Sequence, residues 1–100
     1  MKQKGRNDKY PKEIEIWRSG EKVPEWLLNV AQIVGIDESF GTYILGTNKL
    51  SSGGYEIKDS SGQGVLVHVW NDDDFVCYGD GKIFSLSPKQ LKLLYLWTEN

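Results

Sequence analysis

Between residues 42 and 87, short apolar or alternating runs follow one another, separated by turn sequences. The runs are 42–47 (TYILGT), 55–59 (YEIKD), 65–70 (VLVHVW), 74–79 (DFVCYG) and 82–87 (KIFSLS). Their length and their β-branched and aromatic residues are typical of strands. The segments between them are rich in Gly, Ser and Asn, and the Asp80-Gly81 dipeptide favours a tight hairpin turn. This pattern predicts a mainly antiparallel sheet.

Three further elements are predicted outside this region. Residues 13–19 (EIEIWRS) alternate polar and apolar side chains and predict a strand. Residues 23–35 (VPEWLLNVAQIVG) carry apolar side chains at three- and four-residue spacing, with Pro24 at the first helical position and Gly35 as a stop, and predict a helix. A closing helix begins at Ser87, whose capping box with Gln90 is the clearest local signal in the chain.

The predicted order is β-α-β-β-β-β-β-α, and the fold class is α+β. We expect a twisted, mainly antiparallel sheet or half-barrel of about five to six strands, covered by two helices. Residues 65–70 are nearly all apolar and are expected to form a central strand with both faces covered. Residues 1–12 are predicted to be a flexible basic tail, and residues 13–100 a single domain.

Charge is divided unevenly along the chain. Residues 1–12 carry five basic residues and one acidic residue, whereas residues 13–100 carry seven basic and thirteen acidic residues, a net charge of −6. An acidic body is a poor surface for nucleic acid, because phosphate contacts supply most of the non-specific affinity. Nucleic-acid binding through the basic tail and exposed aromatic residues remains the alternative function.

The single cysteine, Cys77, rules out an internal disulfide. The charged N-terminus lacks the apolar region of a signal peptide, and the longest apolar run is too short to cross a bilayer. We therefore expect a cytoplasmic protein without a membrane partner.

Catalytic and metal chemistry have little support in the sequence. His68 and Cys77 could meet only in one register of neighbouring strands, and both lie in apolar runs, so a place in the core is favoured over a nucleophilic pair. The adjacent carboxylates Asp72, Asp73 and Asp74 lack the alternation, the Gly and the final Glu of a calcium loop. The Gly pairs do not lead into phosphate-binding helices. We expect no catalytic residue, no metal and no cofactor, and hence no enzyme.

Recognition of a protein is the favoured function, because the acidic body carries more aromatic residues than a small core needs. The predicted partner-binding edge, which would suit a basic partner, consists of Trp70, Asp72, Asp73, Asp74, Tyr78 and Asp80. The closing helix adds an apolar stripe that needs a partner or a second subunit, and it consists of Leu93, Leu96 and Trp97.

The last third of the chain resembles a family of small phage and prophage proteins. Asp74-Phe75-Val76 stands where that family has Asp-Tyr-Ile/Val, and Asp80-Gly81-Lys82 matches its hairpin. Pro88 and Tyr95 match the start and the last aromatic of its closing helix. The chain departs from the family pattern at Leu91, where the family has an aromatic residue.

This resemblance, carried mainly by residues 73–95, implies a phage-derived accessory protein that is not an enzyme. Such a protein would act in the host cytoplasm by capturing or inhibiting a host protein or a phage assembly partner. The resemblance supplies no catalytic residue.

Overall fold

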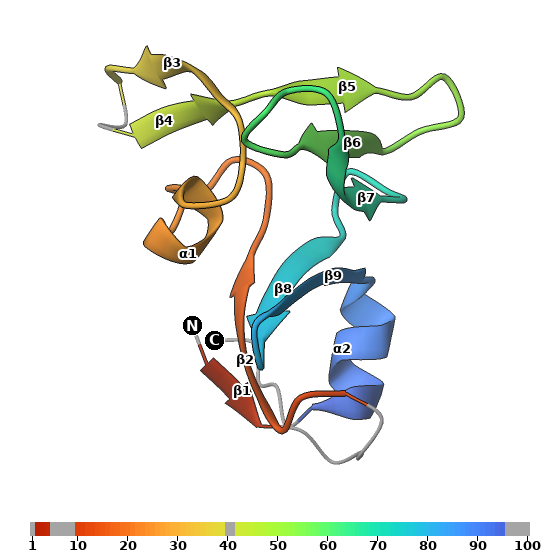
Figure 1. The fold of residues 1–100 in the computed structure, drawn as a ribbon. Helices are drawn as coiled ribbons and strands as arrows, with labels where there is room; N and C mark the ends of the chain where they lie inside the picture. The colour runs from red at the N-terminus through yellow and green to blue at the C-terminus, as the bar shows by residue number, and fades with distance from the viewer. Residues whose placement is uncertain (1, 5–9, 40–41, 96–100) are drawn as a thin grey trace.

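The computed structural model describes residues 2–4, 10–39 and 42–95 of the chain (Figure 1). The strands are β1 (Lys2–Lys4), β2 (Glu13–Trp17), β3 (Ile33–Asp37), β4 (Thr42–Leu45), β5 (Thr47–Lys49), β6 (Tyr55–Lys58), β7 (Val65–Val69), β8 (Phe75–Gly79) and β9 (Lys82–Leu86). The helices are α1 (Glu25–Leu28) and α2 (Pro88–Leu94). Pairing is antiparallel throughout the described residues, in sheets ordered β1-β2-β8-β9, β3-β4 and β5-β6-β7.

The sheet β1-β2-β8-β9 and the helix α2 form one half of the molecule. The side chains buried in the core of this half are Ile14, Phe75, Cys77, Leu86, Leu91 and Tyr95. Asp80 and Gly81 both have positive φ, 51° and 73°, as a type I′ hairpin turn requires. The Ser87 hydroxyl accepts from the Gln90 N–H, and the Gln90 side chain accepts from the Ser87 N–H, which confirms the predicted capping box.

The other half of the molecule contains α1 and the two smaller sheets. Its core consists of Trp17, Val23, Leu27, Ala31, Leu45, Tyr55, Ile57, Val67, Val69 and Val76. Strand β8 contributes to both cores, because Val76 points into this one while Phe75 and Cys77 point into the other. A hydrogen bond of 2.8 Å from the Ser85 hydroxyl to the His68 carbonyl ties β9 to β7.

The small sheets meet where three backbone segments cross. The N–H of Gln32 donates to the carbonyl of Lys58, the N–H of Gly46 donates to the carbonyl of Gln32, and the N–H of Lys58 donates to the carbonyl of Gly46. The Gln32 side chain occupies the space that a Cβ would fill at both Gly46 and Gly62. Glycine at these two positions therefore leaves room for the Gln32 side chain. Gly46 is also the point where β4 gives way to β5.

The predicted α+β class with mainly antiparallel pairing is confirmed, but the predicted helix over residues 23–35 is wrong. The helix ends at Leu28, with Pro24 as its N-cap, and Gly35 lies within β3 rather than after a helix. The hydrogen bonds of Gln32 to Lys58 and Gly46 divert the chain into a strand. Ile33 and Val34 suit that strand, since β-branched residues fit extended backbone well.

The strand count and the position of the central strand also differ from prediction. The described residues form nine strands, because residues 2–4 and 33–37 add two and the run 42–47 continues past Gly46 into β5. Residues 65–70 are not central: β7 ends its sheet, and Val65 is 48% exposed. The strand covered on both faces is β8. Lys2–Lys4, predicted within a flexible tail, pair with β2 as β1.

Candidate functional site

Exposed apolar side chains gather on the β3–β4 hairpin and the residues leading into it. Of the nine large hydrophobic side chains that are exposed in the described part of the chain, six lie between residues 30 and 44, with exposed fractions from 38% to 66%. These six residues, called here the apolar hairpin surface, are Val30, Ile33, Val34, Ile36, Tyr43 and Ile44. Tyr43 pairs with Ile36 and the next residue, Ile44, pairs with Gly35, so the exposed apolar side chains lie on both faces of the hairpin.

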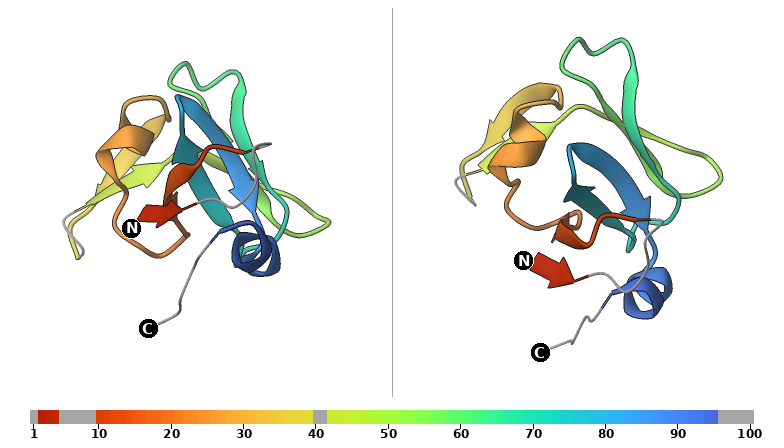
Figure 2. Two further views of the ribbon diagram at one scale, coloured as in Figure 1. Left: turned by 90° about the horizontal axis from the view of Figure 1, so that it is seen from below. Right: turned by 60° about the horizontal axis from the view of Figure 1, so that its bottom comes forward.

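The hairpin also presents backbone that pairs with no other strand in the described residues. Its sheet contains β3 and β4 alone, with a register shift between Ile33 and Gly35. In both views of Figure 2 the hairpin, in yellow, lies across the molecule from α2, in blue. A free apolar edge strand is a template for another strand, and soluble proteins usually protect such edges with charges, bulges or a covering element. Here the bulge and Asp37 are the protecting features.

The hairpin is held at both ends of β4, at Thr42 next to the turn and at Leu45 next to Gly46, so the exposed part is presented on a fixed support. Thr42 is buried, and its hydroxyl accepts from the Val23 N–H at 3.1 Å. Leu45 belongs to the core, and Gly46 forms the crossing with Gln32 described above. A two-stranded hairpin is marginally stable on its own, and these contacts supply the tertiary support that it needs.

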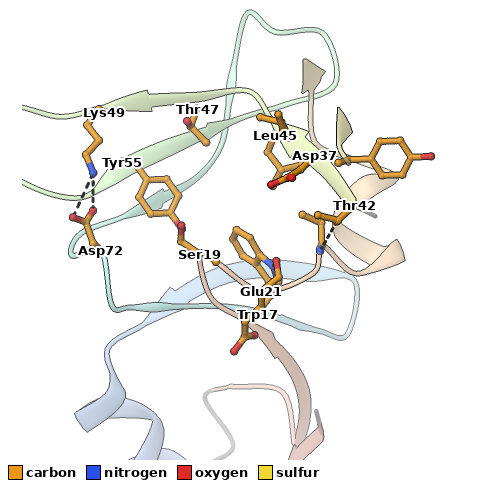
Figure 3. Close-up of a pocket in the computed structure, with 14 residues that line it drawn as sticks. Trp17, Ser19, Glu21, Asp37, Thr42, Leu45, Thr47, Lys49, Tyr55 and Asp72 are labelled. Atoms are coloured by element: carbon orange, nitrogen blue, oxygen red, sulfur yellow. Dashed lines mark hydrogen bonds and ion pairs between the residues drawn. The ribbon is translucent and has the colours of Figure 1, made fainter. Parts of the chain in front are cut away.

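A cavity of about 620 Å³ lies between the hairpin, the β2–α1 connection and β5 (Figure 3). The residues that line it are Trp17, Ser19, Gly20, Glu21, Val23, Asp37, Thr42, Tyr43, Ile44, Leu45, Thr47, Lys49, Tyr55 and Asp72. It therefore shares Tyr43 and Ile44 with the apolar hairpin surface. Its volume falls within the range of about 300–1,000 Å³ that is common for small-ligand sites.

The charged groups of the cavity are unevenly matched. Lys49 pairs with Asp72 at 3.4 Å, and both side chains are exposed, so this ion pair contributes little stability. Asp37 accepts from the Ser39 N–H at 3.0 Å. Among the described residues, no cation forms an ion pair with Asp37 or Glu21. The cavity consequently carries more negative than positive charge.

Tyr55 is the most unusual polar group of the cavity. It is 7% exposed, and its hydroxyl is buried without a hydrogen-bond partner in the described structure. Burial and the nearby Asp72 carboxylate raise the pKa of Tyr55 to about 12. Ser19 lies beside the hydroxyl and lowers this pKa in part, but the two groups do not reach the geometry of a hydrogen bond (Figure 3).

The residues of the predicted acidic edge fall into separate places. Trp70 is 65% exposed and stacks on His68, with ring centroids 3.9 Å apart, and Asp72 and Asp73 are exposed beside it. Asp74, in contrast, is buried. Its carboxylate accepts from the N–H of Asn71 at 3.2 Å and closes the turn that enters β8, while burial raises its pKa.

Tyr78 and Asp80 lie at the far end of β8 from Trp70. Tyr78 is half-buried and stacks on Trp26 with ring centroids 5.3 Å apart, which joins α1 to the large sheet. Asp80 is exposed in the hairpin turn. A five-residue strand of roughly 17 Å separates the two groups, so the structure does not bring the predicted edge together as one patch.

The predicted apolar stripe of the closing helix is described only in part. Leu93 is 67% exposed, whereas Leu96 and Trp97 lie outside the described residues. Leu91 on α2, and Tyr95 directly after it, are almost fully buried.

Cys77 and His68 do not form a couple. Cys77 is fully buried and pairs across the sheet with Ile16 and Phe84, and burial raises the pKa of its thiol to about 12. His68 stacks on Trp70 on another sheet. In the part of the chain that the structure describes, no group of three or more His, Cys, Asp or Glu side chains is placed to hold a metal ion.

No helix among the described residues is long and apolar enough to cross a membrane. Comparison of the chain with protein-family models, with curated proteins and with solved structures finds no match.

The apolar hairpin surface was not predicted from the sequence. The signal was present, because Ile33, Val34 and Ile36 form a β-branched cluster that suits a strand better than a helix. The spacing of apolar residues from Trp26 onward concealed it, since the same spacing also fits a helical face.

Proposed function

We propose that this protein is a protein-binding module that captures an extended segment of its partner along the β3–β4 hairpin. The observation that carries the proposal is the apolar hairpin surface on a sheet that has free edges among the described residues. Strand addition to such an edge satisfies backbone hydrogen bonds, and the alternating side chains of the added strand supply the specificity.

The charge of the chain favours a basic partner segment over a second copy of this protein. Residues 13–100 carry a net charge of −6, and two of the carboxylates in that count, Asp37 and Glu38, lie at the end of β3. Two copies would bring like charges together, whereas a basic segment would be attracted over a distance and oriented as it binds. Trp70, with its exposed ring, and the neighbouring Asp72 and Asp73 provide a second place for such a segment to touch.

The resemblance of residues 73–95 to small phage proteins extends this proposal to the kind of partner. The captured segment would belong to a host protein or to a phage assembly protein, and capture rather than catalysis would be the activity. This origin stays a prediction that the comparisons do not test.

Selection of short random peptides from a displayed library tests the proposal directly. We expect the selected peptides to combine apolar with basic residues, and to lose at least about tenfold in affinity when Val34→Lys and Ile36→Thr are combined, because an edge charge and the loss of apolar contact both oppose strand addition. Leu93→Gln is the matched control, since Leu93 is as exposed as Ile36 but lies on α2.

Equal affinity of the selected peptides for the wild type and the hairpin variant would contradict the proposal. A loss of affinity in Leu93→Gln with none in the hairpin variant would move the binding surface to α2. Both variants change exposed side chains, so their unfolding temperatures should stay close to that of the wild type.

A further inference from the structure

The cavity beside the hairpin has features that strand addition does not use. Apolar and aromatic side chains line it, together with polar groups from four separate segments, residues 17–23, residues 37–49, Tyr55 and Asp72. Trp17 contributes its ring alone, because its indole N–H already donates to the Glu21 carbonyl at 3.0 Å. Tyr43 and Tyr55 add two further rings. Aromatic walls of this kind attract cations through the negative faces of the rings.

The charge of the cavity also favours a cation. Glu21, Asp37 and Asp72 line it, and the one lysine of the lining, Lys49, is already paired with Asp72. Asp37 lies on the hairpin side and has no ion pair within the described residues (Figure 3). A cation entering the cavity would meet a carboxylate whose hydrogen bond, among the described residues, comes from the backbone N–H of Ser39.

Tyr55 supplies an independent reason to expect a ligand. A buried hydroxyl without a partner is unfavourable, and each such group in a folded protein calls for an explanation. Tyr55 is more than nine-tenths buried, lines the cavity and has no hydrogen-bond partner in the described structure. A ligand that donates an N–H after displacing the Ser19 side chain would satisfy the hydroxyl oxygen.

From these observations we infer that the cavity binds a cationic nitrogen group carried on a short apolar stem. Asp37 is its counter-ion, the rings of Trp17 and Tyr43 enclose the stem, and the Tyr55 hydroxyl accepts one N–H. Two sources carry this chemistry: a free alkylamine, and a lysine or arginine side chain of a bound protein. The inference goes beyond the proposed function, because a free amine would bind without any protein partner.

Titration of the full chain with n-butylammonium and n-butylguanidinium tests the inference, with n-butanol as the neutral probe. The indole N–H resonance of Trp17 reports on the cavity. We expect saturable binding of at least one cation and at least about tenfold weaker binding of n-butanol, since a cation next to a carboxylate and aromatic rings gains energy that the alcohol lacks. The inference would be overturned if neither cation binds and neither of the blocked lysine and arginine derivatives described below binds. Equal binding of n-butanol and the cations would also overturn it.

A pair of charge-removing variants locates the site. Asp37→Asn should weaken cation binding at least about fivefold while its Oδ1 still accepts from the Ser39 N–H. Asp73→Asn removes the same charge from an exposed residue that does not line the cavity, and it should bind the cations as the wild type does. Unchanged binding in Asp37→Asn, or an equal loss in Asp73→Asn, would overturn the inference.

The two sources are separated with blocked amino acids. N-acetyl-lysine methylamide and its arginine counterpart present the side chain as a protein would, and the norleucine analogue removes the charge. Binding of the blocked lysine or arginine alone assigns the cavity to a protein side chain, and binding of the free cations as well assigns it to either source. The Val34→Lys/Ile36→Thr variant should lose peptide binding but keep cation binding. Peptide binding therefore tests strand capture, and cation binding tests this inference separately.

Discussion

Replacing Tyr55 by Phe should stabilise the protein, and replacing Tyr95 by Phe should destabilise it. Both tyrosines are buried, but their hydroxyls differ in environment. The Tyr55 hydroxyl has no hydrogen-bond partner in the described structure, whereas the Tyr95 hydroxyl donates to the Pro11 carbonyl at 2.7 Å. The same chemical change therefore removes an unpaired group in one case and a buried hydrogen bond in the other.

The size of each effect follows from the cost of burying a polar group. Burying an unpaired hydroxyl costs about 1–3 kcal/mol, so we expect Tyr55→Phe to raise the free energy of unfolding by about 1 kcal/mol. For a domain of this size, that gain corresponds to an increase in unfolding temperature of roughly 4–8 °C. Tyr95→Phe also leaves the Pro11 carbonyl without its donor, and we expect a loss of about 1–2 kcal/mol.

Alkaline pH provides a second readout of the Tyr55 hydroxyl. The pKa of Tyr55 is raised from 10.0 to about 12, so between these values the unfolded chain loses a proton that the folded chain keeps. The free energy of unfolding of the wild type should therefore fall as the pH rises above 10, and Tyr55→Phe should remove part of that fall. Tyr95 and Cys77, whose pKa values are also raised to about 12, supply the part that remains.

Urea and thermal unfolding of the two variants at neutral pH, and again above pH 10, is the assay. Opposite signs at neutral pH and a weaker alkaline fall in Tyr55→Phe would support the account. A loss of stability in Tyr55→Phe comparable to that in Tyr95→Phe would refute the reasoning. It would mean that the Tyr55 hydroxyl has a partner in solution, with Ser19 the nearest candidate.

Three further predictions concern the turns and the cap. Gly54→Ala should destabilise the protein severely, because φ is +77° and a Cβ would collide with the backbone at the end of β7. Gly53→Ala has open space around it and should cost only the strain of its positive φ. Unfolding temperatures compare the two variants, and equal losses of stability would contradict the geometry. Asp74→Asn should raise the free energy of unfolding at neutral pH, because burial raises the pKa of Asp74 and disfavours its charged form. The gain should vanish as the pH falls below the ordinary Asp pKa. A pH series of unfolding midpoints, with Asp73→Asn as control, tests this, and a destabilised variant at neutral pH would contradict it. Ser87→Ala should cost about 1 kcal/mol through loss of the capping box, and denaturant unfolding that shows no change would contradict the role of the cap.

The features that could be predicted from the sequence are those decided by neighbouring residues. The Asp80-Gly81 turn needs positive φ at both positions, and the Ser87–Gln90 capping box joins residues three apart. The β3–β4 hairpin could not be predicted in this way. Its course depends on the hydrogen bonds of Gln32 with Lys58 and Gly46, residues distant in sequence, and these override a pattern that fits a short helix equally well.

The candidate site shows the same division between local and distant causes. The exposure of Asp72 and Asp73 agrees with a simple expectation for carboxylates, but nothing in the sequence distinguishes Asp74, which is buried by its bond to Asn71 and the packing of β8. The cavity draws its lining from residues between Trp17 and Asp72, which no local motif connects. Such a site becomes visible only once the sheets are assembled.

Amide hydrogen exchange along β3, measured with and without a peptide selected by the wild-type protein, tests the central claim most directly. If a partner segment adds to the hairpin edge, exchange of amides within Ile33–Asp37 should slow at least about tenfold while α2 is unaffected. Unchanged exchange in β3 at saturating peptide, with protection confined to α2 or to the turn before β8, would contradict the claim.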